Sequence, residues 1–165
     1  MMFFTPPPAE RFMTVVPMDG SQRFSILEGT RQPSIPITSP DGKWMVYSFT
    51  ESGRREVYIR TFPTGGARLQ ISGNGGSNIG LSPDGRRLYL ATPTALRVAT
   101  LKVGGSLPRV VRTDSLFPND FRDYSEHPGG KEIALLRESA AGVKLVVVMN
   151  WLDEVMPKLK GAKGP

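Results

Sequence analysis

The sequence predicts an all-β fold in which a unit of four strands repeats along the chain. The first observation is the turn sequence Ser-Pro-Asp-Gly at residues 39–42, which returns at residues 82–85 and, as His-Pro-Gly-Gly, at residues 127–130. The prolines of the three copies lie 43 and 45 residues apart. The second observation is that each copy holds several short segments of strand length. Such a repeat is typical of β-propeller blades, so we expect a partial propeller of about 3.5 four-stranded antiparallel blades.

Composition fits this fold and excludes several classes of function. The 165 residues suffice for one sizeable core, and 18 glycines with 15 prolines suit short strands joined by tight turns. Without cysteine, neither a disulfide framework nor a thiolate zinc site can form. The net charge is +6, but the basic residues are dispersed, and nucleic-acid binding needs a contiguous basic stripe. We therefore expect no nucleic-acid partner.

The sequence also predicts no membrane span and no signal peptide. No segment reaches the about 20 apolar residues that a membrane helix needs. Residues 1–8 lack both a basic region and a long apolar region, which a signal peptide would have.

Each element of the repeat is predicted from its apolar runs and turn residues. The expected blades span, in order, residues 1–30, 31–73, 74–113 and 114–150, and residues 151–165 form a short helix and a basic tail. In the first blade, strands are expected at 1–4, 12–16 and 23–27, with a hairpin turn at Asp19-Gly20 because both residues tolerate positive φ. The strands of the second blade are expected at residues 34–38, 44–49, 56–62 and 68–71.

The third and fourth blades repeat this plan between two connectors. The connectors are expected at residues 72–78 and 112–121. The third blade has strands expected from Ile79 onward and at 87–92, 96–103 and 109–111, and the fourth at 122–125, 132–137 and 143–149. A helix is expected at residues 151–156, because Asn150 is a suitable N-cap and the first turn carries two acids.

The apolar pattern predicts sheets that are covered on both faces. Met45, Tyr47 and Phe49 alternate with Trp44 and Val46, so both faces of this strand are apolar. Stacked blades would cover both faces. A two-sheet sandwich is the alternative, and the repeat favours the modular blades.

No catalytic, cofactor-binding or metal-binding residue is predicted. His127 is the sole histidine and is expected to be a solvated turn residue, because no Gly-x-Ser-x-Gly nucleophile motif accompanies it. The glycine-rich residues 73–80 match neither a phosphate loop nor a dinucleotide fingerprint and are interpreted as a connector. The Ser-Pro-Asp-Gly turns have a structural interpretation, in which side-chain oxygens accept bonds from nearby backbone N–H groups.

Five carboxylates and three tyrosines are further candidates. The carboxylates show no metal-ligand spacing, and they are Glu51, Glu56, Asp114, Asp120 and Asp123. Asp120 and Asp123 flank Arg122, which suggests an ion pair within the connector. The tyrosines are expected to pack within or between blades, and they are Tyr58, Tyr89 and Tyr124.

The repeat, with a strand such as residues 56–60 after it, resembles the TolB-type, WD-repeat-like β-propeller over roughly residues 1–150. Residues 144–154 are similar to the C-terminus of bacterial proteins in which a serine/threonine kinase domain precedes such a propeller. The resemblance implies a non-enzymatic protein-interaction or sensory module, binding a protein partner through connectors 72–78 and 112–121. It would act outside the cytoplasm if tethered to a membrane kinase.

Two alternatives follow from what the sequence lacks. Kinase glycine-loop, His-Arg-Asp and Asp-Phe-Gly motifs are missing, and family propellers usually have more blades. The chain would then be the non-catalytic C-terminal portion of a serine/threonine kinase or serine peptidase, active only with a catalytic domain. Alternatively, two copies would form a homodimer that completes the propeller.

Overall fold

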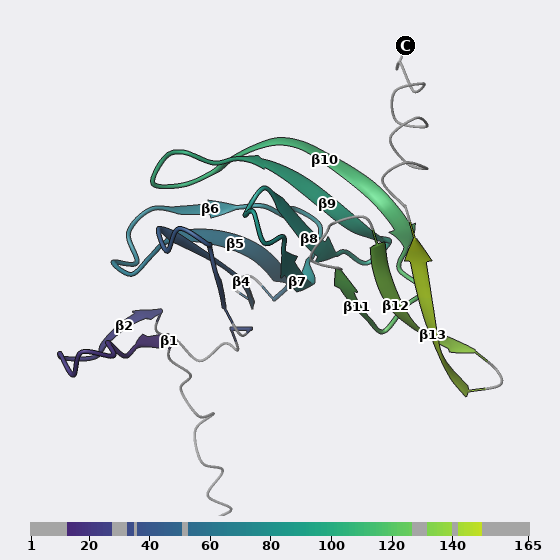
Figure 1. Cartoon of the computed structure of the whole chain (residues 1–165), viewed down its shortest axis with the longest axis horizontal. Helices are drawn as coiled ribbons and strands as arrows, with labels where there is room; N and C mark the ends of the chain where they lie inside the picture. The colour runs from purple at the N-terminus through teal and green to yellow at the C-terminus, as the bar shows by residue number, and fades with distance from the viewer. Residues whose placement is uncertain are drawn as a thin grey trace, which may run out of the picture. The chain divides into compact units, whose positions relative to one another are not determined.

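The computed structural model describes residues 13–27, 33–34, 36–50, 53–126, 132–139 and 142–149, and all regular structure in this part of the chain is β (Figure 1). Its strands form antiparallel sheets, which confirms the predicted all-β class. Among the described residues no helix is long and apolar enough to cross a membrane. The strand expected at residues 1–4, the turn at 127–130 and the C-terminal helix lie outside the described residues.

The described strands fall into two compact units. The first unit holds a two-stranded sheet, formed by β1 (Met13–Val15) and β2 (Phe24–Leu27), and a four-stranded sheet. The four-stranded sheet has the order β3-β4-β5-β6, a meander of sequential neighbours. Its strands are β3 (Ile37–Thr38), β4 (Trp44–Thr50), β5 (Arg55–Thr61) and β6 (Arg68–Gln70).

Strand β4 is buried on both faces, as its apolar pattern predicts. Trp44 and Val46 on one face and Met45 and Tyr47 on the other are each at most 1% exposed. Met45 and Tyr47 belong to a cluster with Met13 and Ile26 of the two-stranded sheet, together with Phe49 and Tyr58. Hence neighbouring sheets of the first unit share a core, the arrangement expected of stacked blades.

The second unit holds a four-stranded and a three-stranded sheet. The first has the order β10-β9-β8-β7, and the second has the order β11-β12-β13. The strands of the former are β7 (Ser77–Leu81), β8 (Arg87–Ala91), β9 (Ala95–Lys102) and β10 (Arg109–Pro118). The strands of the latter are β11 (Asp123–Glu126), β12 (Glu132–Ser139) and β13 (Gly142–Met149). Tyr89, Leu96 and Val98 of the first sheet pack with Ile133 and Leu135 of the second.

The two Ser-Pro-Asp-Gly turns have the same internal bonding. In the first, Ser39 Oγ donates to Asp41 Oδ1 at 2.7 Å and accepts the backbone N–H of Trp44 at 3.1 Å. In the second, Ser82 Oγ donates to Asp84 Oδ1 at 2.6 Å and accepts the N–H of Arg87 at 2.8 Å. The glycines have φ of 67° and 68°, which only glycine adopts at low cost. These bonds confirm the structural interpretation of the motif.

The prediction of a connector at residues 112–121 is wrong for most of that range. Strand β10 continues to Pro118 and pairs with β9 along its whole extent, from Arg109 opposite Lys102 to Pro118 opposite Ala95. This strand is hard to recognise in the sequence because residues 112–115, Arg-Thr-Asp-Ser, are polar. An outer strand that is mostly exposed needs no apolar face, so hydrophobic alternation is absent. The connector expected at 72–78 also ends earlier, since Ser77 and Asn78 belong to β7.

Candidate binding site between strands β7 and β11

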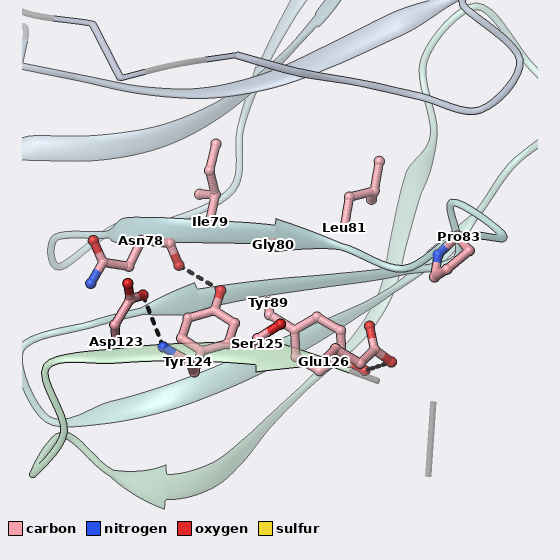
Figure 2. A pocket seen from close by; sticks show the side chains of 10 residues that line it. All are labelled: Asn78, Ile79, Gly80, Leu81, Pro83, Tyr89, Asp123, Tyr124, Ser125 and Glu126. Atoms are coloured by element: carbon pink, nitrogen blue, oxygen red, sulfur yellow. Dashed lines mark hydrogen bonds between the residues drawn. The ribbon is translucent and has the colours of Figure 1, made fainter. Parts of the chain in front are cut away.

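A pocket of about 310 Å³ lies within the second unit, where β7 of one sheet faces β11 of the next. Its lining is mostly polar and comes from these two strands, the turn after β7, and β8. The lining residues are Asn78, Ile79, Gly80, Leu81, Pro83, Tyr89, Asp123, Tyr124, Ser125 and Glu126. In Figure 2 the Tyr124 ring stands between the two strands, and Ile79 and Leu81 project from the opposite side of β7.

Two hydrogen bonds hold the strands on either side of the pocket together. The Tyr124 hydroxyl donates to the main-chain oxygen of Asn78 at 2.5 Å (Figure 2). The side-chain amide of Asn78 donates to the main-chain oxygen of Arg122 at 3.3 Å. Asn78 has φ of 42°, a left-handed conformation that asparagine tolerates better than most residues. The ends of β7 and β11 are therefore fixed to each other.

Gly80 lets the tyrosine lie against β7. A Cβ atom at position 80 would lie 3.2 Å from the Tyr124 hydroxyl oxygen and 3.3 Å from its Cε2. The Tyr124 ring also packs against two other rings, with centroid distances of 6.3 Å to Tyr89 and 6.0 Å to Phe121. This packing confirms that Tyr89 and Tyr124 pack between sheets, as the sequence predicts.

Glu126 is a buried carboxylate in the lining of the pocket. Its side chain is only 8% exposed. Its Oε1 atom accepts the Tyr89 hydroxyl at 2.6 Å and lies 3.2 Å from the Arg87 guanidinium. Burial raises the pKa of Glu126, and the bonds from Tyr89 and Arg87 partly oppose that effect. Within the described residues, the bonds to this carboxylate end on Oε1.

Both tyrosines in the site are held in the protonated form. Burial, followed by the bond to Glu126, raises the pKa of Tyr89 above its usual range. Burial, with a smaller effect from Asp123, raises the pKa of Tyr124 in the same direction. Each hydroxyl therefore acts as a hydrogen-bond donor within the fold and is a poor general base near neutral pH.

Glu56, another candidate, has a structural role in the first unit. The carboxylate is 3% exposed and accepts bonds from Ser72 Oγ at 2.5 Å, Arg54 Nε at 2.6 Å and the Gly75 N–H at 3.0 Å. Ser72 Oγ in turn accepts the N–H of Val57 at 2.8 Å. The glycine-rich connector is thus closed over this carboxylate, and both of its oxygens are occupied.

The remaining sequence candidates are not brought together. Asp123 lines the pocket, and its Oδ1 accepts the N–H of Tyr124 at 2.9 Å. Asp114 pairs with Arg112 at 2.6 Å on β10. Glu51 and His127 lie outside the described residues. Within the described ranges, no three acidic or histidine side chains gather as a metal site would require.

The prediction of an ion pair within the connector is wrong, because the structure shows other partners for Arg122 and Asp120. Arg122 pairs with Glu138 at 2.5 Å, and Asp120 pairs with Arg137 at 3.2 Å. Both partners lie on β12, and so the pairs run from the connector to the neighbouring strand. Sequence proximity alone does not decide the partner, because β12 returns antiparallel beside the connector and brings opposite charges closer.

Sequence reasoning missed Asn78 and Glu126 as pocket residues. One signal was available for Glu126. It precedes the third turn at the position that Thr38 and Leu81 occupy before the first two turns. The equivalent position before the other two turns holds an uncharged residue. A carboxylate there indicates that its charge is paired with another group. Asn78 carried no comparable signal.

Solved structures with the same arrangement of sheets identify the fold. TolB from Acinetobacter baumannii superposes with a TM-score of 0.56 at 19% identity, over 80% of this chain and 33% of the other. A protein assigned as TolB from Agrobacterium tumefaciens superposes with a TM-score of 0.61 at 15% identity, over 85% of this chain and 53% of the other. The chain has the TolB-type β-propeller fold. The sandwich alternative is therefore excluded.

A solved structure named for an enzyme also superposes on this chain. A protein assigned as a 6-phosphogluconolactonase from Bacteroides fragilis superposes with a TM-score of 0.51 at 12% identity, over 82% of this chain and 49% of the other. The chain thus spans between a third and about half the length of these structures. No protein-family model and no curated protein matches the sequence. At these identities the likeness shows the fold alone.

Proposed function

We propose that this chain is a non-enzymatic, protein-binding part of a TolB-type β-propeller, and that the pocket between β7 and β11 is its binding site. The observation that carries the proposal is that the polar groups of the pocket make bonds within the fold with some of their atoms only. One oxygen of Glu126 and one of Asp123 are used to fix the fold. Both carboxylates, together with the exposed Ser125, line a cavity that can receive a ligand.

The state of the titratable groups supports binding over catalysis. Tyr89 and Tyr124 donate their hydroxyl protons to acceptors within the fold, and the pKa of each is raised. Glu126 is tied to Arg87. A hydrolase would instead need an activated nucleophile beside a general base. In this proposal a protein partner therefore contacts a site in which Tyr89, Tyr124 and Glu126 already make bonds within the fold.

A peptide-display selection against the purified 165-residue chain tests the proposal. Random peptides would be selected on the wild type and counter-tested on Ser125→Phe, in which a ring occupies the pocket without touching the buried network. We expect the selected peptides to bind the wild type and to lose binding to the variant. Failure to select peptides, or equal binding to both chains, would overturn protein binding at this pocket.

The non-enzymatic part of the proposal needs its own assay. Ester, peptide and lactone substrates should show no turnover above the buffer rate. Turnover by the wild type that disappears in Glu126→Gln or in a His127 variant would overturn it. The Ser125→Phe chain serves as a check that any residual rate does not come from a contaminant.

Two broader arrangements remain proposals. The chain spans only part of the solved structures it resembles. A second candidate is the non-catalytic portion of a larger kinase- or peptidase-linked protein, which rests on the resemblance of residues 144–154. That candidate predicts an adjoining sequence in which the repeat continues and reaches a kinase or hydrolase motif. A homodimer that completes the propeller is the other arrangement. Light scattering after size-exclusion chromatography would give twice the monomer mass for the homodimer.

A further inference from the structure

We infer that the pocket between β7 and β11 receives a basic side chain, an arginine or lysine, of the bound partner. This inference rests on the proposed function, since it names the chemistry of a ligand for the same site. It goes further by committing to a cation, and a neutral or acidic ligand would contradict it. Four features carry it: the hydrogen-bonding groups of the lining, their charge, the burial of Glu126, and the size of the cavity.

The groups that remain for a ligand are mainly acceptors. The bonds shown by the structure use the amide nitrogen of Asn78, Oδ1 of Asp123 and Oε1 of Glu126. Each of these side chains retains one further oxygen, and oxygens of this kind accept but do not donate. Both tyrosine hydroxyls in the lining already donate elsewhere. A ligand rich in N–H donors therefore matches the site.

The charge of the lining has the sign that a cation needs. Among the described residues, the lining contains the carboxylates of Asp123 and Glu126 and no lysine or arginine. Arg87 lies beside Glu126, but it pairs with Oε1. The chain as a whole is basic, with a net charge of +6, whereas this lining is acidic. A second cation at Oε2 would complete the coordination of the carboxylate.

Burial makes Glu126 the stronger of the two anchors. Its side chain is 8% exposed, so little water screens it, and a charge-assisted hydrogen bond there is stronger than at the surface. Asp123 is exposed at the rim and contributes mainly by attraction and orientation. A guanidinium or ammonium group that enters the pocket would contact the buried Glu126, while the exposed Asp123 lies three positions away on the same strand.

The size of the pocket favours a single side chain over a larger ligand or a metal ion. Its volume of about 310 Å³ is at the lower end of the range for ligand pockets, about 300–1,000 Å³. A metal ion would need several ligands in one shell, and no cluster of three acidic or histidine residues exists in the described part of the chain. An organic cation at the end of an extended side chain fits both facts.

A titration followed by NMR tests the inference with a defined probe. N-acetyl-arginine amide would be added to the ¹⁵N-labelled chain, with N-acetyl-citrulline amide as its neutral isostere. We expect the arginine compound alone to shift the amide signals of β7 and β11 in a saturable manner. Asp123→Asn should weaken its binding about threefold, because it removes one exposed charge. Glu138→Gln, which neutralises an exposed carboxylate outside the lining, should leave the affinity unchanged.

The outcomes separate this inference from the proposed function. Equal shifts with citrulline, shifts elsewhere in the chain, or equal effects of Asp123→Asn and Glu138→Gln would overturn the basic side chain. Display-selected peptides that require an open pocket but contain no arginine or lysine would do the same and leave protein binding intact. Saturable arginine binding at β7 and β11 without any selected peptide would support the cation site and count against a protein partner.

Discussion

The side-chain hydroxyl of Tyr124 donates a hydrogen bond of 2.5 Å to the main-chain oxygen of Asn78. The donor lies on β11 and the acceptor on β7, so this bond joins the first strands of two sheets. Gly80 makes it possible, because any Cβ at that position would press on the tyrosine. The Tyr124 hydroxyl and the missing side chain at position 80 thus both contribute to the spacing of the two strands, together with the bond from the Asn78 amide to Arg122.

Removing the Tyr124 hydroxyl should measurably destabilise the chain. In Tyr124→Phe the ring packing persists, but the carbonyl of Asn78 loses its donor. We expect the free energy of unfolding to fall by about 1 kcal/mol, the usual net contribution of one such bond. Urea-induced unfolding monitored by circular dichroism would measure the loss, and the m-value should be unchanged because the folded core stays intact.

Tyr47 offers a matched control for this substitution. Its hydroxyl is buried, and it has no hydrogen-bond partner in the part of the chain that the structure describes. Removing an unpartnered polar group from a core carries no bond loss, so Tyr47→Phe should be neutral or stabilising. If the two variants lose equal stability, the bond between Tyr124 and Asn78 makes no net contribution.

A methyl group at position 80 should also destabilise the chain. The new Cβ in Gly80→Ala would lie 3.2 Å from the Tyr124 hydroxyl oxygen, and a shift of the ring away from it would disturb the bond to Asn78 and the packing against Tyr89 and Phe121. Overpacking of this kind costs about 1–3 kcal/mol. In the double variant Gly80→Ala/Tyr124→Phe the ring is free to shift, so the loss should be smaller than the sum of the two single losses.

Gly73→Ala is the control for the Gly80 substitution. Nothing lies within 4 Å of a Cβ at position 73, and its φ is not in the left-handed region. Alanine there should be neutral or slightly stabilising, because it reduces the freedom of the unfolded chain. The thermal midpoints of Gly80→Ala and Gly73→Ala, measured in the same buffer, would show whether the methyl group at position 80 destabilises the chain. Equal midpoints would show that Tyr124 accommodates the methyl group without cost.

The sequence predicted the sheets well wherever burial dictates the pattern. Strand β4 is apolar on both faces because both faces are covered, and its bounds of residues 44–50 differ from the prediction by one residue. The turns were predictable because their hydrogen bonds are local. Ser39 Oγ donates to Asp41, and the Gly42 N–H donates to the main-chain oxygen of Ser39. Their equivalents at residues 82–85 repeat the same bonds.

The parts that failed depend on contacts distant in sequence. Strand β10 is an exposed outer strand, so no apolar alternation marks residues 112–118. The pocket is formed by Asn78 and Tyr124, which are 46 positions apart and meet only through the stacking of sheets. Glu126 is paired with a tyrosine 37 positions earlier. Sequence periodicity reports burial and turns, but it does not report which polar groups meet across sheets.

The turn glycines allow a test of backbone conformation without steric interference. Gly42 has φ of 67°, and nothing lies within 4 Å of a Cβ built there. Gly42→Val should therefore cost stability through the backbone alone, by about 1–2 kcal/mol, because a side chain disfavours the left-handed region. Gly42→Asn should cost clearly less, since asparagine tolerates that region. Differential scanning calorimetry would rank the two, and an equal effect would show that φ is not the cause.

Glu56 should make the stability of the chain dependent on pH in the acid range. Burial by itself would raise the pKa of Glu56, but bonds from Ser72, Arg54 and the Gly75 N–H outweigh it and hold the pKa below its usual value. The folded chain therefore binds fewer protons than the unfolded chain between the two pKa values. The stability that Glu56 contributes is fully present above the unfolded pKa of about 4.3 and is lost as the pH falls through the folded pKa.

Glu56→Gln isolates this contribution. At pH 7 the variant should be less stable by about 1–3 kcal/mol, because the donors around a buried carboxylate lose their charged acceptor. The difference from the wild type should narrow steadily as the pH falls below about 4.3, since the wild-type carboxyl is then protonated. Glu138→Gln, at a side chain that is 55% exposed and paired with Arg122, should lose at most about 1 kcal/mol at pH 7. A gap between wild type and Glu56→Gln that stays constant from pH 7 to pH 3 would mean that Glu56 stabilises the connector by its shape and not by its charge.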